Sequence, residues 1–267
     1  MSRSTVGRIL DEADLKPHRS HYWLNSHDPD FDAKAKNICQ LYLDAPRFHE
    51  QGRLVLSSDE KTGMQILQRK YPTRPARPGF IEKREFEYIR HGTRALLTTF
   101  CVPTGEVVWN LNPTRTSIDW VRHLENVATQ FPLMKRFDWV VDNLNTHWSL
   151  EVCQWVAEQS GIPFVGPALR TGPQRRKFLS DPSHKHVFHF TPIHGSWLNQ
   201  VERWFGLITQ QAIRRGSFRS VKDLIARIDH FVRHYNRSCR PFAWTATADS
   251  ILNKLARLCS RISGTAH

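Results

Sequence analysis

Residues 53–59 read Arg53-Leu-Val-Leu-Ser-Ser-Asp59. This β-rich run of apolar residues predicts a strand, and it leads directly into an acid. The next apolar runs, 95–102 and 106–111, flank the short segment Pro103-Thr-Gly105. Two such runs around a segment with Pro and Gly are typical of a β-hairpin. This region therefore predicts three strands, of which the last two are antiparallel.

Helical and β-rich segments alternate after the hairpin. Apolar residues at helical spacing predict a helix over 117–131, and Trp-Val-Val before Asp142 predicts a short strand over 138–142. A helix over 149–159 and a short strand over 187–191 follow. This order predicts an α/β protein with a mixed sheet and helices on both faces. It is also the order of the ribonuclease H-like fold, in which acids at two strand ends face one on a later helix.

The remaining segments are mostly helical in pattern. Residues 69–80 are an exception, because their Pro and Arg content predicts an extended loop. Further helices are predicted over 4–12, 33–43, 197–215, 221–235 and 246–258.

Charge is distributed unevenly along the 267 residues. Lys and Arg total 38 against 25 Asp and Glu, a formal net charge of +13. Stretches 66–94, 166–185 and 203–219 together carry the whole excess. Localised positive charge suits a polyphosphate partner, because each neutralised phosphate releases counterions. The pattern therefore favours nucleic acid binding, and the alternative is three ordinary solvated faces.

Composition argues against several other classes of protein. With 40% hydrophobic residues the chain can bury a core. No apolar run approaches the roughly 18 residues of a membrane span, and the first residues lack the apolar stretch of a signal peptide. Five widely spaced Cys without a CxxC pair are typical of free thiols in a reducing cytosol. We therefore expect a cytoplasmic protein without a membrane partner.

Three acids stand out by position. Asp59 and Asp142 each end a predicted strand. Glu202 flanks the apolar stripe of the predicted helix 197–215, and Asn199, one turn earlier, shares its face. An acid at the edge of a buried stripe can reach a strand end. A chain with 25 acids offers many such triples, so the spacing alone is a weak signal.

Converging carboxylates suit divalent cations. They repel one another without a metal ion, and Mg²⁺ prefers oxygen ligands. Phosphodiester cleavage by two ions requires carboxylates that hold the ions a few ångströms apart. We therefore expect two Mg²⁺ ions, with Mn²⁺ as a substitute, bound by Asp59, Asp142 and Glu202.

Three segments resemble a known family. They are Asp142-Asn-Leu-Asn-Thr-His147, Pro192-Ile-His-Gly-Ser-Trp-Leu-Asn-Gln-Val-Glu-Arg-Trp-Phe205 and Arg240-Pro-Phe-Ala-Trp-Thr245. They resemble bacterial insertion-sequence transposases of the mariner superfamily (the insertion sequence 630 family), and the Trp-Leu-Asn-x-x-Glu block is specific. The resemblance covers essentially the whole chain. It implies a ribonuclease H-like catalytic core, whose catalytic metal ligands would be Asp59, Asp142 and Glu202.

The resemblance also implies an activity. It predicts a DDE transposase that cleaves double-stranded DNA at transposon ends by metal-dependent hydrolysis and transfers the freed 3′-hydroxyl into target DNA. It further implies a homodimer on the DNA and a bacterial, nucleoid-associated location. Two alternatives remain open, namely an inactive or regulatory DNA-binding remnant and a hydrolytic nuclease of the same fold.

The chain departs from the family pattern in two ways. The interval between Asp142 and Glu202 is unusually long, and we interpret its surplus, 166–185, as a DNA-contacting loop or a surface insertion. Residues 2–18 resemble only the end of the helix-turn-helix region of these transposases. The expected domains are a helix-turn-helix remnant with a linker (1–50), the catalytic domain (51–215) and a helical C-terminal extension (216–267).

Other residues are expected to support or to compete with this site. Glu60 would point to the other face of the sheet if its strand continues. Four His between 184 and 194 make a zinc site conceivable, but no Cys lies nearby and zinc is disfavoured. Residues expected beside the metal ligands are Asn143, His147 and Asn199. Residues expected to contact DNA are Arg170, Arg175, Arg176, Lys177, Arg214 and Arg215.

Overall fold

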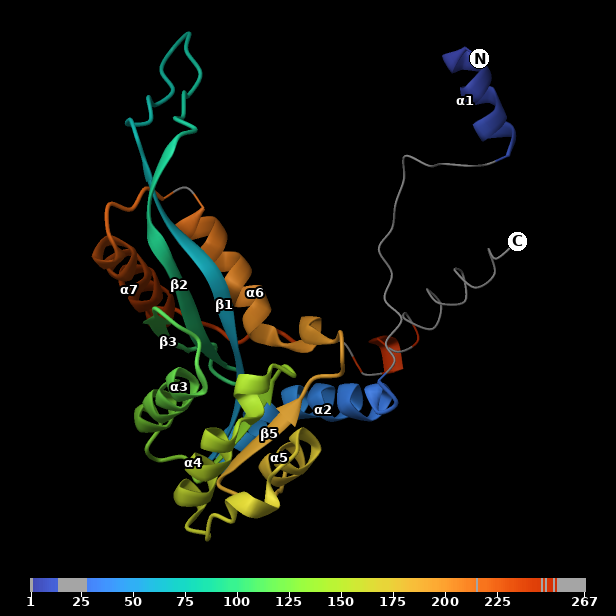
Figure 1. Cartoon of the computed structure of the whole chain (residues 1–267), viewed down its shortest axis with the longest axis vertical. Coiled ribbons are helices and arrows are strands. Elements are labelled where there is room, and N and C mark those ends of the chain that lie inside the picture. The colour runs from blue at the N-terminus through green and yellow to red at the C-terminus, as the bar shows by residue number, and fades with distance from the viewer. Residues whose placement is uncertain are drawn as a thin grey trace.

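The computed structural model describes residues 2–13, 28–214, 216–245, 247, 249–251 and 253. Its centre is a mixed five-stranded sheet of order β3-β2-β1-β4-β5 (Figure 1). The first three strands are antiparallel neighbours, and β4 and β5 continue the sheet in parallel. The strands are β1 (Arg53–Arg69), β2 (Tyr88–Cys101), β3 (Val107–Asn112), β4 (Arg136–Val141) and β5 (His186–Phe190). The predicted order of strands is therefore confirmed.

Helices cover both faces of the sheet, as predicted, because β1 is apolar on both of its sides. Val55 belongs to the core beneath one helical layer, while Leu54 and Leu56 belong to the core beneath the other. The first layer contains α2 (Phe31–Glu50), α6 (Gln200–Ile208) and α7 (Val221–Arg237). The second contains α3 (Ser117–Gln130), α4 (Leu150–Ser160) and α5 (Gly172–Leu179) (Figure 1).

Side-chain caps fix where the helices of the second layer begin. Thr116 and Asp119 form a capping box at α3, and Ser149 accepts the backbone N–H of Val152 at α4. At the other end of α4, Gly161 adopts φ +65°, the left-handed conformation that commonly ends a helix. These local signals set the start of α3 and both ends of α4. The remaining α-helix among the described residues is α1 (Arg3–Glu12).

The predicted loop within 166–185 is wrong, because α5 forms there. Thr171 and Gln174 make a capping box, and Pro173 stands in the first turn, where its missing N–H costs nothing. Leu179 at the end of α5 is fully buried. Arg175, Arg176 and Lys177 therefore lie on an ordered helix, whereas Arg170 and Lys185 lie outside it.

The predicted continuous helix 197–215 is also wrong. A 3₁₀ turn occupies Ser196–Leu198, Asn199 is extended, and α6 begins only at Gln200. Tertiary hydrogen bonds from Asn199 to β1 hold it out of the helix. A π-helical turn, Thr209–Ile213, follows α6.

Other boundaries differ in detail. α2 continues through Pro46 to Glu50, well beyond the predicted 33–43. Most of the predicted helix 246–258 lies outside the described residues. None of the described helices has the length and apolar character that crossing a bilayer requires.

Candidate active site

Two carboxylates lie where the parallel pairing of β1 with β4 ends, at the carboxyl end of β4. We call this end of the pair the sheet edge. Ser57 of β1 is paired with Val140 of β4. Asp59 and Asp142 each follow two residues later, so they lie at the same level of the sheet. Asp59 is buried, whereas a third of the Asp142 side chain is exposed. Parallel pairing thus brings together two acids that are distant in the sequence.

The charges at this edge repel one another. The pKa of Asp59 is raised to about 8, first by burial and then by the carboxylate of Asp142, with a further contribution from Glu60. Burial acts in the same direction on Asp142, but hydrogen bonding to His147 outweighs it and lowers the pKa of Asp142. A divalent cation relieves such repulsion, and carboxylate oxygens are the donors that Mg²⁺ prefers. The donor set therefore fits a divalent metal ion.

His147 is fully buried between two acids. Its Nδ1 lies 2.8 Å from Oδ1 of Asp142, and its Nε2 lies 2.9 Å from Oε2 of Glu60. Burial lowers the pKa of this imidazole, but the hydrogen bonds to the two carboxylates raise it to about 10. The ring also packs against Trp120 at a centroid distance of 4.2 Å. A charged His147 therefore joins Glu60 to Asp142 and fixes the Asp142 side chain.

Glu60 belongs to the site, although its place beside Asp59 in a continuing strand predicts that it points to the other face of the sheet. Potential ligand atoms of Asp59, Glu60 and His147 all lie within 4.8 Å of one another. Glu60 neighbours the site because the segment after β4, which carries His147, folds against β1. No local pattern around Glu60 signals this contact.

Asn199 connects the start of α6 to β1. Its Nδ2 donates to the backbone carbonyl of Ser58 at 3.0 Å and to Oδ2 of Asp59 at 3.3 Å. Its Oδ1 accepts the Ser57 hydroxyl, which in turn accepts the backbone N–H of Val201 at 2.8 Å. These bonds give the Leu and the Asn of the Trp-Leu-Asn block a structural role. Leu198 is buried in the core, and Asn199 fixes the start of α6 beside Asp59.

Glu202 lies one helical turn beyond Asn199. Its backbone N–H donates to the carbonyl of Asn199 at 3.1 Å, and its side chain is exposed. Residues three apart in a helix share a face, so Glu202 lies on the side of α6 that carries Asn199. Among the described residues, the group of ligand atoms within 4.8 Å contains neither Glu202 nor Asp142.

Residues 55–225 match the model of the DDE superfamily endonuclease family. This span is more than half of the chain and includes Asp59, Asp142 and Glu202. The chain belongs to the DDE superfamily endonucleases.

Solved structures support the fold of this DDE endonuclease. One similar structure is the Mos1 mariner paired end complex with Mn, with a TM-score of 0.51 and 14% identity over 100% of this chain and 72% of that chain. Another is the Mos1 transposase paired-end complex with left transposon end, with a TM-score of 0.53 and 14% identity over 94% and 68%. The ribonuclease H-like fold is thereby confirmed. No curated protein sequence matches the chain.

Asn143 of this DDE endonuclease stabilises the loop after β4. Its Nδ2 donates to the carbonyl of Thr191, just beyond β5, at 2.6 Å. Its own carbonyl accepts the indole N–H of Trp148 at 3.1 Å. The guanidinium of Arg176 on α5 lies 4.9 Å from the centre of the Trp148 ring. The loop that follows Asp142 is therefore connected to both β5 and α5.

The residues expected to contact DNA differ in how far their side chains are exposed and in whether they are already hydrogen-bonded. Nε of Arg175 donates to the carbonyl of Leu169 at 2.8 Å, and Arg175 is only partly exposed. Arg170, Lys177 and Arg214 are exposed, and Arg215 lies outside the described residues.

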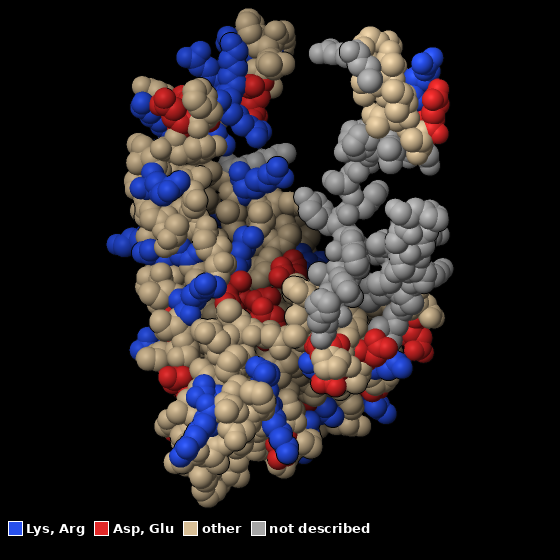
Figure 2. Space-filling model, turned by 45° about the vertical axis from the view of Figure 1, so that its right-hand side comes forward, with Lys and Arg blue, Asp and Glu red and all other residues tan. Residues whose placement is uncertain are grey.

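Figure 2 shows acidic side chains gathered in a hollow near the middle of one face, with Lys and Arg around it.

The histidines near β5 have structural roles in the DDE endonuclease. His189 bonds to the buried Asp138 at 3.0 Å and to Asn37 at 2.9 Å. His186 is buried and stacks on Phe137. Among the described residues, the close group of potential metal ligands contains no histidine from this cluster. These contacts give no support to the zinc alternative.

A chain of buried hydrogen bonds begins at Ser58, the residue before Asp59 in β1. The hydroxyls of Ser58 and Thr99 lie 2.8 Å apart, and His123 contacts Thr99 through Nε2 at 2.9 Å. Its Nδ1 lies 2.6 Å from Oδ1 of Asn110. Burial, with a smaller contribution from His147, lowers the pKa of His123 to about 3. His123 is therefore neutral in the folded protein at pH 5 and above.

We predict that His123 makes the protein sensitive to mild acid. As the pH falls from about 6.5 towards 3, the unfolded chain gains a proton here that the folded chain does not. The free energy of unfolding then decreases by about 1.4 kcal/mol per pH unit. His123→Gln should reduce the number of protons taken up on unfolding by about one. Urea unfolding between about pH 6 and pH 5 measures this number from the pH dependence of the free energy of unfolding. Exposed His230 provides the control His230→Gln, and an unchanged slope in the His123 variant would contradict the assignment.

Proposed function

We propose that this DDE endonuclease is the transposase of a bacterial insertion sequence of the 630 family. It would cleave double-stranded DNA at the transposon ends and transfer those ends into target DNA. The observation that carries the proposal is the meeting of Asp59 and Asp142 at one sheet edge, with Glu202 one turn beyond the Asn199 that bonds to Asp59. Similar solved structures are described as transposase complexes with a transposon end, which supports DNA as the substrate.

Asp59, Asp142 and Glu202 are proposed to hold two Mg²⁺ ions, for which Mn²⁺ substitutes. Such ions activate an attacking oxygen and stabilise the leaving oxygen of a phosphodiester. The chain's own residues position the ligands: His147 fixes Asp142, and Asn199 fixes Asp59. Both contacts come from buried side chains, so the two carboxylates are oriented before the substrate arrives.

The proposed reaction uses one site twice. Water attacks the phosphodiester at the transposon end, the P–O bond breaks, and the strand is left with a 3′-hydroxyl. That hydroxyl then attacks a phosphodiester of the target, which releases a 3′-hydroxyl of the target strand. We propose that Arg170, Arg176, Lys177 and Arg214 bind phosphates around these steps, and that two copies of the chain act together on the DNA.

The test is a reaction with the duplex ends that flank the gene, a target plasmid and Mg²⁺. We expect strand cleavage at the ends and covalent joining of the ends to the plasmid, both abolished by EDTA. Cleavage without joining of a supplied 3′-hydroxyl end would establish the hydrolytic nuclease instead. Binding of the DNA without either reaction would establish the DNA-binding remnant.

A further inference from the structure

The hairpin of β1 and β2 continues beyond the sheet as an arm, residues 70–87 (Figure 1). Its two limbs remain paired. The backbones of Arg74 and Lys83 exchange hydrogen bonds of 2.9 and 3.0 Å, and those of Arg77 and Phe80 exchange bonds of 3.1 and 2.8 Å. Between the latter pair, Pro-Gly forms the turn, with Gly79 at φ +78° as a type II turn requires. The arm is therefore a two-stranded ribbon, so the extended loop predicted for 69–80 forms one limb of a paired hairpin.

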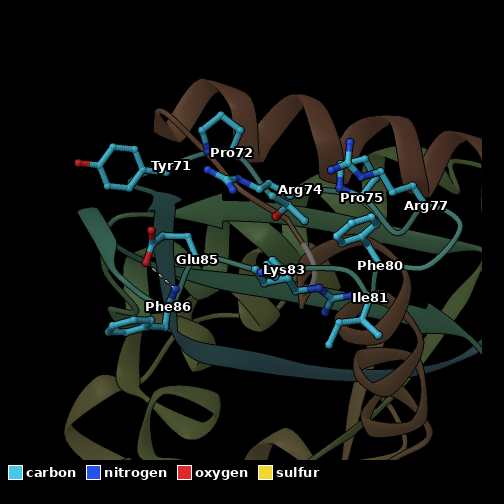
Figure 3. A pocket seen from close by; sticks show the side chains of 12 residues that line it. Tyr71, Pro72, Arg74, Pro75, Arg77, Phe80, Ile81, Lys83, Glu85 and Phe86 are labelled. Carbon is cyan, nitrogen blue, oxygen red and sulfur yellow. Dashed lines mark hydrogen bonds between the residues drawn. The ribbon is translucent and has the colours of Figure 1, made fainter.

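Positive charge is concentrated on this ribbon. Two of its cations are neutralised locally, because Lys70 lies 2.7 Å from Glu87 and Arg84 contacts Glu82. Within the described part of the chain, three others form no ion pair: Arg74, Arg77 and Lys83. Figure 3 shows Arg74 and Lys83 in the middle of the arm and Arg77 near its turn. A narrow projection with uncompensated cations attracts a polyanion.

Large apolar side chains on the same ribbon face solvent. Ile81 is 81% exposed, Phe86 is 82% exposed and Phe80 is 59% exposed. Phe80 and Ile81 lie next to the turn, and the guanidinium of Arg77 is 4.6 Å from the centre of the Phe80 ring (Figure 3). These side chains line an open pocket of about 1200 Å³. Exposed apolar groups gathered in this way mark an interaction surface.

We propose that the arm binds duplex DNA, with Arg74, Arg77 and Lys83 on phosphates and with Phe80 and Ile81 as a wedge between base pairs. This inference rests on the proposed function, because it takes the DNA substrate as the partner. A two-stranded β-ribbon is narrow enough to enter a groove of duplex DNA. Apolar side chains that insert between two base pairs unstack that step and kink the duplex. A purely apolar partner would leave the three cations without counter-charges, whereas DNA satisfies both features.

The arm would reach DNA well away from the cleaved bond. Fifteen residues separate Asp59 from Arg74 along one limb, and extended chain rises roughly 3.3 Å per residue, so the two lie up to roughly 50 Å apart. Duplex DNA rises about 3.4 Å per base pair. The arm therefore reaches flanking duplex up to roughly 15 base pairs from the site, and it acts as a second anchor that bends the substrate.

The charge part of the proposal is tested by the salt dependence of DNA affinity. A variant with Arg74→Gln, Arg77→Gln and Lys83→Gln should reduce the slope of log K against log salt by about 3, since each phosphate contact contributes about 0.9. The matched control carries Arg122→Gln, Lys222→Gln and Arg237→Gln, which removes equal charge from exposed sites on α3 and α7. Equal slopes for the two variants would overturn the proposal.

The wedge is tested by fluorescence energy transfer between the two ends of a flanking-sequence duplex, in EDTA so that no cleavage occurs. The full chain should bend the duplex, and Phe80→Ala with Ile81→Ala should remove a bend of at least about 20°. The control is Leu133→Ala with Ile118→Ala, two exposed apolar residues elsewhere. An unchanged bend, or loss of self-association with unchanged DNA affinity, would overturn the proposal, the latter in favour of a second copy as partner. Because no catalysis is required, failure of the proposed reaction would be seen separately.

Discussion

Asp142→Asn is expected to abolish Mg²⁺-dependent DNA cleavage while the chain still binds DNA. Asparagine keeps the size of the side chain but removes the charge that a divalent ion requires. A metal ion contributes several kcal/mol to stabilisation of the transition state, so the rate should fall by roughly 10³-fold or more. The measurement pairs single-turnover cleavage of end-containing duplex with a binding titration in EDTA.

The matched control for this variant is Glu125→Gln. Glu125 is an exposed acid on α3, and its substitution removes one negative charge without touching the site. It should cleave at the wild-type rate. Persistent cleavage by the Asp142 variant would remove Asp142 from the metal site, and loss of DNA affinity would show that the fold had been damaged.

Glu202→Gln is expected to have a similar effect on cleavage with no loss of stability. The side chain is exposed, so the free energy of unfolding should change by less than about 0.5 kcal/mol. Cleavage should nevertheless fall by roughly 10³-fold, because the proposed third carboxylate ligand is lost. Isothermal titration of Mn²⁺ into the variant should show fewer bound ions than titration into the wild-type chain.

Glu60 provides the decisive comparison, because its carboxylate groups with Asp59 and competes for the role of third ligand. Glu60 is bonded to the buried His147, so Glu60→Gln should lower the free energy of unfolding by about 3 kcal/mol. In a folded preparation at low temperature, it should retain much more cleavage activity than Glu202→Gln. If Glu60→Gln abolishes cleavage while Glu202→Gln does not, the ligand is Glu60 and the assignment of Glu202 is wrong.

The sequence predicted the layers of the fold because each layer has a local pattern. Apolar runs ending at Asp59 and Asp142 marked two strands that proved to be parallel neighbours. The stripe containing Val201, Phe205 and Ile208 is buried as the helical spacing required. Burial of one face is encoded within a segment, so it can be recognised without knowing the packing partner.

Errors arose where a tertiary contact overrides a local pattern. The spacing around Asn199 continues a helix, yet its side chain bonds to β1 and delays the start of α6. The Pro-rich segment within 69–80 has no strand pattern, yet it pairs with the opposite limb of the arm. In the first place the bonds reach a distant strand, and in the second they reach the other limb of the same hairpin; both outweigh the local preference.

The sequence by itself determined the order of the five strands and of most helices, and it placed Asp59 and Asp142 next to apolar strand segments. Only the tertiary structure decided that His147 lies between Asp142 and Glu60 and that the arm presents its cations and apolar side chains together. The physical reason is that burial patterns are properties of one segment, whereas these contacts join separate segments. They depend on strand register and on how each loop packs against the sheet, which no single stretch of residues specifies.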